Sequence, residues 1–254
     1  MTLIFYAFAR EAAVFKRRLA GRTALGIDGL RGFRGRLGAT EIVGIATGLG
    51  IRRAADTARR ALQSFTSADL VIATGLAGAL GEELQPGDLV LADCLILDRE
   101  RDDGAPVTIA PLTIAIPPCE LARFKVALQA HRLSFATGTI LTSAQILQDG
   151  AAKRAARART GALAVDMESA AIAAETHRCG LRFACVRAVL DTVDEKIVGA
   201  ELAGPDGEVR PLAAAGFVLR NPMAVIGLAR MMRSLNRATA ALAAALEALN
   251  QPRP

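Results

Sequence analysis

The stretch Ala164-Val165-Asp166-Met167-Glu168-Ser169-Ala170-Ala171-Ile172-Ala173-Ala174-Glu175 decides the fold, because its character changes along its length. Its first residues are apolar, which is typical of a buried strand, and its later residues are rich in alanine, which favours helix. Asp166 and Glu168 therefore lie at a junction between a strand and a helix. A carboxylate near a helix N-terminus is stabilised by the helix dipole and by free backbone N–H groups.

This stretch alone leaves two interpretations of its acids open. A carboxylate that is fixed at the junction and faces a pocket could hold two neighbouring hydroxyls of a sugar. Alternatively, the acids only cap the helix, which is the better interpretation for an isolated Asp-Met-Glu. The rest of the chain has to decide between them.

The composition indicates one large core. The chain has 254 residues, of which 52% are hydrophobic and 22% are charged, and no linker or block of charge divides it. We therefore expect a single domain over residues 1–254. No apolar run is long enough to span a membrane, and Glu11 follows soon after the first apolar run, which argues against a secretory signal.

Cysteine usage and charge exclude two further classes of protein. The four cysteines have no CxxC spacing and only two histidines accompany them, so we expect a reduced, cytoplasmic protein without metal or organic cofactor. The net charge of +6 invites a nucleic-acid partner, but the chain has one Tyr, no Trp and no recognisable nucleic-acid motif. Its densest basic segment, 153–159, is predicted to be the solvated face of a helix.

Apolar runs and helical patterns alternate along the chain. We expect strands at 2–9, 40–46, 69–73, 89–97, 134–141 and 182–190, and helices at 14–19, 51–65, 121–131 and after Glu168. This order predicts an α/β fold with a mostly parallel, twisted central sheet flanked by helices. In such sheets ligands collect at the C-terminal ends of the strands.

Charged residues and glycines fall at or near these strand ends. Glu11 follows the first strand, and Asp191 ends the last one. Arg187 lies inside that last strand, where a charge needs a partner, and a carboxylate of the site is its natural one. Gly-rich turns at 47–50 and 74–78 suggest close approach of the backbone to a ligand, although neither matches a Walker loop or a dinucleotide fingerprint.

Six motifs in collinear order resemble the nucleoside phosphorylase and nucleosidase superfamily, and their layout is most similar to the methylthioadenosine/S-adenosylhomocysteine nucleosidases. The resemblance spans residues 3 to 195. The motifs are Ala7-Phe8-Ala9-Arg10-Glu11, Thr47-Gly48-Leu49-Gly50, Ala73-Thr74-Gly75-Leu76-Ala77-Gly78-Ala79-Leu80, Pro86-Gly87-Asp88-Leu89-Val90, Val165-Asp166-Met167-Glu168 and Val186-Arg187-Ala188-Val189-Leu190-Asp191.

The resemblance implies roles for individual residues. Asp191 corresponds to the acid that protonates the purine at N7, which requires a pKa raised by burial. Glu168 corresponds to the carboxylate that binds the ribose 2′ and 3′ hydroxyls, with Met167 packed beneath the sugar. The segment 142–147 forms one wall of the base pocket. The further expected substrate contacts are Asp166, Gly75, Leu76, Ala77, Gly78, Thr142, Leu147 and Ile146, the last where relatives usually carry an aromatic residue.

The nucleophile stays open at this point. Where phosphorylases of the superfamily grip phosphate, this chain has Glu11, Ala73 and Leu76. Glu11 with Arg187 resembles the water-activating arrangement of the nucleosidases. The residues that could still form a different phosphate site at the Gly-rich turns are Thr47, Gly48, Arg10 and Arg52.

The C-terminal part bears on the substrate. An extra apolar stretch and a helix cover about 194–249, with Leu212, Phe217, Val218 and Leu219 in the stretch and Asn221-Pro222 at the start of the helix. The helix carries an apolar stripe interleaved with Arg230, Arg233 and Arg237. Core packing is the default explanation of such a stripe, and membrane contact is the alternative.

This tail resembles the hopanoid-associated members of the family, which release adenine from adenosylhopane. We therefore expect cleavage of the N-glycosidic bond of a 5′-substituted adenosine, with adenosylhopane as the preferred substrate. The protein is expected to form a homodimer and to contact the inner membrane face peripherally. The alternatives are a methylthioadenosine/S-adenosylhomocysteine nucleosidase and a non-catalytic nucleoside-binding protein, which would not need Asp191.

Overall fold

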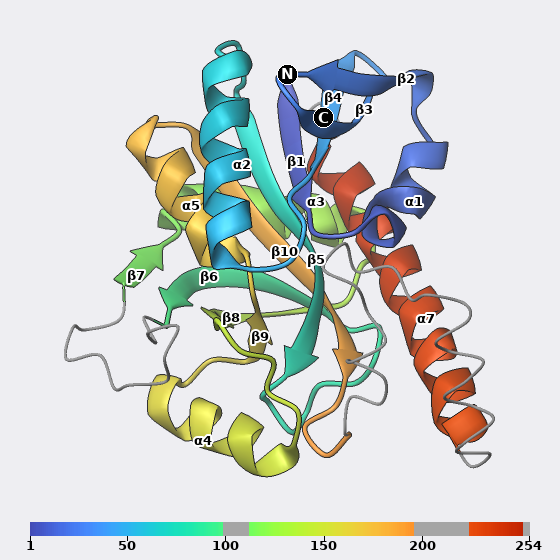
Figure 1. The fold of residues 1–254 in the computed structure, drawn as a ribbon, viewed down its shortest axis with the longest axis vertical. Helices are drawn as coiled ribbons and strands as arrows, with labels where there is room; N and C mark the ends of the chain where they lie inside the picture. The colour runs from blue at the N-terminus through green and yellow to red at the C-terminus, as the bar shows by residue number, and fades with distance from the viewer. Residues whose placement is uncertain (99–111, 196–223, 251–254) are drawn as a thin grey trace.

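The computed structural model describes residues 1–98, 112–195 and 224–250 (Figure 1). The strands are β1 (Thr2–Tyr6), β2 (Ala20–Ile27), β3 (Leu30–Leu37), β4 (Thr40–Ala46), β5 (Leu70–Ala79), β6 (Leu89–Leu97), β7 (Leu112–Ala115), β8 (Phe135–Thr142), β9 (Ala164–Asp166) and β10 (Arg182–Asp191). The helices are α1 (Ala9–Arg17), α2 (Ile51–Ser64), α3 (Pro118–Ala130), α4 (Gly150–Thr160), α5 (Ser169–Arg178) and α7 (Ala224–Asn250).

These elements form an α/β fold around one sheet, as expected, but the sheet is mixed rather than mostly parallel. Its strand order is β10-β6-β8-β9-β5-β1-β4-β3-β2, and β10 also pairs with β5, so that one half of the sheet closes on itself. The pairs β1–β4, β1–β5, β5–β10, β6–β8 and β8–β9 are parallel. The pairs β2–β3, β3–β4, β5–β9, β6–β7 and β6–β10 are antiparallel.

The hairpin of β2 and β3 was not predicted from the sequence. Asp28 and Gly29 connect the two strands with φ angles of +50° and +71°, which suits the two-residue turn that Asp-Gly favours between antiparallel strands. The strands themselves are rich in arginine and glycine. Those residues interrupt the alternation of apolar side chains by which a half-buried strand is recognised.

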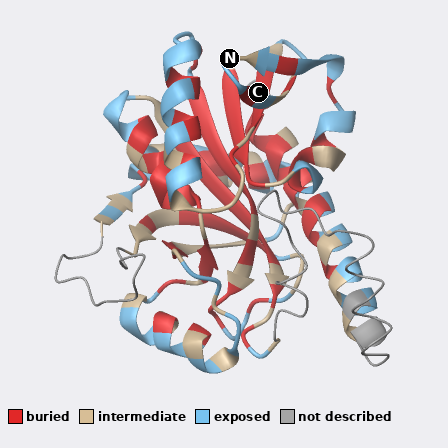
Figure 2. Ribbon diagram, viewed as in Figure 1, coloured by how far each residue is buried: buried red, intermediate tan, exposed pale blue. Residues whose placement is uncertain are grey.

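Helices cover both faces of the sheet, and the sheet between them is largely buried (Figure 2). Successive residues of β1 pack against opposite helix layers. Leu3 and Phe5 join the cluster that includes α2 and α5. Ile4 and Tyr6 join the cluster that includes α1, α3 and α7. The parallel strands at the centre are therefore buried on both sides, which explains their nearly continuous apolar sequences.

The C-terminal half of α7 is a core helix. Leu242, Leu246 and Leu249 are buried in the cluster that includes α1 and α3, so core packing explains the apolar stripe there. Arg230, Arg233 and Arg237 are exposed. None of the helices in the described ranges is long and apolar enough to cross a membrane. The predicted anchors Leu212, Phe217, Val218 and Leu219 lie outside the described residues.

Candidate active site

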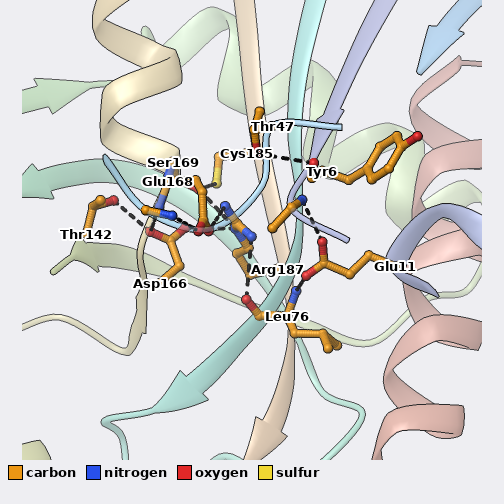
Figure 3. A network of polar contacts seen from close by, with 12 residues as sticks. Tyr6, Glu11, Thr47, Leu76, Thr142, Asp166, Glu168, Ser169, Cys185 and Arg187 are labelled. Carbon is orange, nitrogen blue, oxygen red and sulfur yellow. Dashed lines mark hydrogen bonds and ion pairs between the residues drawn. The ribbon is translucent and has the colours of Figure 1, made fainter. Parts of the chain in front are cut away.

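Arg187 on β10 lies at the centre of a buried network of polar groups (Figure 3). The residue is only 1% exposed. Its Nε lies 2.8 Å from Asp166 Oδ2 and donates to Ser169 Oγ at 2.9 Å. Its Nη2 lies 3.7 Å from Glu168 Oε2. The structure therefore supplies the carboxylate partners that a charge inside a strand requires.

Asp166 bonds to the start of α5 as well as to Arg187. Its Oδ1 accepts hydrogen bonds from the Thr142 hydroxyl at 2.7 Å and from the N–H groups of Glu168 and Ser169 at 3.2 Å. The Thr142 hydroxyl accepts in turn from the N–H of Ala170. These bonds hold Asp166 and Thr142 to the start of α5. The substrate contact expected of both residues stays a prediction.

Glu168 connects this junction to the turn before α2. Its Oε1 accepts a hydrogen bond from the N–H of Gly50 at 2.9 Å. Burial raises the pKa of Glu168 to about 7, against the opposing effect of Arg187. A carboxylate with such a pKa changes its charge in the neutral range.

Glu11 lies in the first turn of α1 and is buried. Its Oε2 accepts from the N–H groups of Ala7 and Phe8 at 2.7 and 3.0 Å, and its Oε1 accepts from the N–H of Leu76 at 2.8 Å. Burial raises the pKa of Glu11, and Arg187 and these three backbone bonds oppose the rise. Glu11 is thus fixed in orientation next to β5.

Gly75 separates Glu11 from Arg187. It has a φ of +143°, and a Cβ on it would lie 2.4 Å from Arg187 Nη1 and 2.6 Å from Glu11 Oε1. Such contacts are too close for any real side chain. The predicted Gly-rich turn at 74–78 is wrong, because these residues belong to β5. Gly75 is required there so that both charged groups can approach the backbone of the strand.

Asp191 lies further along the same pair of strands. In the parallel register of β10 and β5, Arg187 is opposite Gly75 and Asp191 is opposite Gly78. Three residues of a strand span about 10 Å, so Arg187 and Asp191 lie opposite positions of β5 that are this far apart. Burial raises the pKa of Asp191, as expected, and the Lys153 ammonium opposes the rise.

Lys153 corrects one expectation. The sequence predicted that residues 153–159 form the solvated face of a helix, and α4 is indeed helical, but Lys153 is 0% exposed. It forms an ion pair with Asp191. Ala156, three residues along the same helix, is also buried, so these two positions share the inward face of α4.

The expected wall of the base pocket is partly exposed. Ile146 is 40% exposed, and Leu147 packs against the small cluster that contains Leu80 and Val165. Met167 and Leu76 are half-buried, and Ala77 is buried. The base-pocket wall expected at 142–147 therefore stays a prediction.

The four residues of the alternative phosphate site differ in their surroundings, and a phosphate site formed by them stays a prediction. The Thr47 hydroxyl bonds to the carbonyl oxygens of Tyr6 and Gly48, and the N–H of Gly48 donates to the Ala7 carbonyl. Arg10 is exposed and lies 3.9 Å from the Met232 Sδ on α7. Arg52 is exposed on α2. Within the described ranges, no cluster of His, Cys, Asp and Glu is arranged to hold a metal ion.

The sequence predicted the acids of the site but not the residues that hold these acids and Arg187 in place. Ser169 accepts from Arg187 and lies 3.0 Å from Cys185 Sγ, and Gly50 donates to Glu168. Ser169 directly follows Asp166-Met167-Glu168, so its position at the helix start was the available signal. Only the packing of α5 against β10 reveals the contact to Cys185.

We expect Gly75→Ala to remove activity, because the added methyl group collides with both Arg187 and Glu11. The variant should also unfold at lower denaturant concentration, which urea unfolding followed by circular dichroism measures. Gly26→Ala is the matched control, since a Cβ there meets nothing within 4 Å. Normal stability of Gly75→Ala would contradict this geometry.

Comparison with known proteins agrees with this architecture. The family model of the phosphorylase superfamily matches residues 3–215. The structure of 5′-methylthioadenosine/S-adenosylhomocysteine nucleosidase from Neisseria meningitidis with methylthio-immucillin-A aligns with a TM-score of 0.75 at 21% identity, over 98% of this chain and 97% of that one.

Two further structures align over nearly their whole length. S-adenosylhomocysteine nucleosidase from Streptococcus pyogenes has a TM-score of 0.72 at 24% identity, over 99% of this chain and 97% of its own. Futalosine hydrolase of Helicobacter pylori has a TM-score of 0.73 at 17% identity, over 96% of each chain. These likenesses establish the fold, and the match over residues 3–215 establishes that the chain belongs to the phosphorylase superfamily.

Proposed function

We propose that the protein cleaves the N-glycosidic bond of a 5′-substituted adenosine and releases adenine. One observation carries the proposal: three buried carboxylates, Glu11, Glu168 and Asp191, lie around the paired ends of β5 and β10. The fold is shared with nucleosidases whose structures contain methylthio-immucillin-A and adenine. A nucleoside-binding protein without catalytic activity would have no need of the buried acid at Asp191.

Asp191 acts in this proposal as the general acid. A proton delivered to N7 of the purine turns adenine into a neutral leaving group. The raised pKa of Asp191 supports this role, because a carboxyl group must hold its proton in order to deliver it. Gly78, the neighbour of Asp191 on β5, has no side chain to cover the carboxylate.

Glu168 holds the sugar. Its ionised carboxylate accepts hydrogen bonds from the ribose 2′ and 3′ hydroxyls and stabilises the positive charge that develops on the ribose. The N–H of Gly50 and the Arg187 guanidinium fix the orientation of this carboxylate from the protein side. Met167 is half-buried next to it in the chain and packs beneath the sugar.

Water is the proposed nucleophile, with Glu11 as the group that activates it. Glu11 and Glu168 place two carboxylates on either side of Arg187, and these repel a phosphate dianion in a site of low dielectric constant. Thr47 and Gly48 are already bonded to backbone carbonyls. The reaction is therefore a hydrolysis rather than a phosphorolysis.

The finer proposal concerns the 5′ substituent, which we take to be a hopanoid chain, as in adenosylhopane. The apolar residues of the segment 194–220 and the exposed Arg230, Arg233 and Arg237 of α7 support a lipid-linked substrate. The rival substrates are methylthioadenosine and S-adenosylhomocysteine, which are small and soluble.

Adenine release from three substrates tests the proposal. The purified protein is incubated with adenosylhopane in detergent micelles, with methylthioadenosine and with S-adenosylhomocysteine, each with and without phosphate, and adenine is measured by liquid chromatography. We expect release without phosphate, and fastest from adenosylhopane. Strict dependence on phosphate would contradict the hydrolytic mechanism, and preference for methylthioadenosine would contradict the lipid substrate.

Asp191→Asn is the variant for the same assay. An amide has no proton to give, so the rate should fall by about 10²–10⁴-fold, the usual contribution of general acid catalysis. Asp88→Asn is the control, because Asp88 is a carboxylate whose Oδ2 accepts from the N–H of Gln85 in the turn before β6. Equal rates for Asp191→Asn and the unchanged protein would remove Asp191 from the mechanism.

Binding of ribosides should depend on pH through Glu168. Its carboxyl group is neutral at pH values below its pKa of about 7 and ionised at higher pH. Only the ionised form accepts two hydrogen bonds from the diol. The affinity for an unreactive adenosine analogue should therefore rise between pH 6 and pH 8, relative to that for its 2′,3′-dideoxy counterpart. Calorimetry measures both; the same pH dependence in Glu168→Gln would show that another group is responsible.

A further inference from the structure

Lys153 is a fully buried lysine whose ammonium contacts Asp191. The Nζ forms an ion pair with Asp191 Oδ2 and donates to the carbonyl oxygens of Thr192 at 2.6 Å and Glu195 at 3.3 Å. An ammonium has three donors, and all three are used. The lysine therefore binds both the carboxylate at the end of β10 and the turn that follows it.

A buried ammonium is costly unless it is paired and hydrogen-bonded. The neighbouring residue Arg154 shows that α4 can hold the same turn from solvent, since it pairs with Asp194 and with Glu82 at the surface. Anchoring of the turn alone thus does not require a buried cation. What distinguishes Lys153 from Arg154 is its bond to Asp191.

The charged groups that act on Asp191 are few. Among the described residues they are Lys153 from α4, which favours the ionised carboxylate, and Glu195 from the turn, which disfavours it. On β5 and β9 the neighbours of the carboxylate are Gly78 and Val165, which carry no charge. In the same part of the chain no hydrogen bond reaches Asp191 Oδ1, whereas Oδ2 is the oxygen that contacts Lys153.

From this geometry we propose that Lys153 is a positioning residue for the reaction: its ammonium fixes Asp191 through Oδ2 and directs Oδ1 toward the base. The proposal rests on the role of Asp191 as general acid. Lys153 itself does not touch the substrate.

Removing the charge of Lys153 changes the pKa of Asp191 in a definite direction. Burial raises the pKa of Asp191 and Lys153 opposes it, so Lys153→Met should raise that pKa further. An opposite charge in contact typically lowers the pKa of a carboxyl group by about 1–3 units. Asp191 should then stay protonated to a pH higher by about 1–3 units.

Adenine binding provides a readout that does not need turnover. A protonated Asp191 donates a hydrogen bond to N7 of adenine, so affinity should fall as pH rises through the pKa of Asp191. Calorimetric titration with adenine between pH 5 and pH 9 locates this fall. We expect it to move up by about 1–3 pH units in Lys153→Met, to return toward its original place in Lys153→Arg, and to vanish in Asp191→Asn.

Arg154→Met is the matched control. It removes a cation from the adjacent position of α4 and a bond to the same turn, but not the contact with Asp191. Its pH dependence of adenine binding should equal that of the unchanged protein. An equal shift in Arg154→Met and Lys153→Met would reduce Lys153 to an anchor of the turn and overturn the proposal.

The two proposals fail in different ways. If Asp191→Asn keeps the pH dependence of adenine binding, Asp191 is not the acid and the proposed mechanism fails. If Asp191→Asn abolishes it but Lys153→Met, folded as judged by circular dichroism, leaves it in place, only the role of Lys153 fails. Should Lys153→Met not fold, Lys153→Gln in the same titration decides, because it keeps hydrogen bonding without the charge.

Discussion

The buried guanidinium of Arg187 is the constraint on which the site depends. A charge inside a strand of a sheet covered on both faces is tolerated only with partners, and here Asp166 and Glu168 provide them. Asp166 is in turn held by the N-terminus of α5. The ion pair therefore joins β10 to the strand–helix junction, and both must be correctly placed before either charge is satisfied.

The same constraint explains the glycines of β5. Gly75 lets both Arg187 and Glu11 approach the strand where a Cβ would otherwise lie, and Gly78 leaves the carboxylate of Asp191 uncovered. The parallel register of β5 and β10 sets the spacing between Arg187 and Asp191 along the site. Catalytic groups on a covered central sheet are held more rigidly than groups on surface loops.

Much of this arrangement was predictable from local sequence. The strands near the site are long apolar runs, and Glu11, Glu168 and Asp191 stand where those runs end. Lys153 was missed because arginines and alanines surround it in α4, and nothing in that pattern distinguishes a buried cation from a solvated one. The β2–β3 hairpin was missed because arginine and glycine hide its alternation. The pairing of Arg187 with Asp166 depends on tertiary contacts, which no local pattern contains.

A double-mutant cycle between Arg187 and Asp166 measures how strongly the two buried charges depend on each other. The free energy of unfolding is measured by urea titration for Arg187→Met, for Asp166→Asn and for both together. Breaking a buried pair from one side typically costs about 3–5 kcal/mol, so each single variant should be strongly destabilised. The double variant should lose less than the sum of the two, by at least about 1 kcal/mol. Losses that add within about 0.5 kcal/mol would mean that the two residues act independently, and would contradict the account.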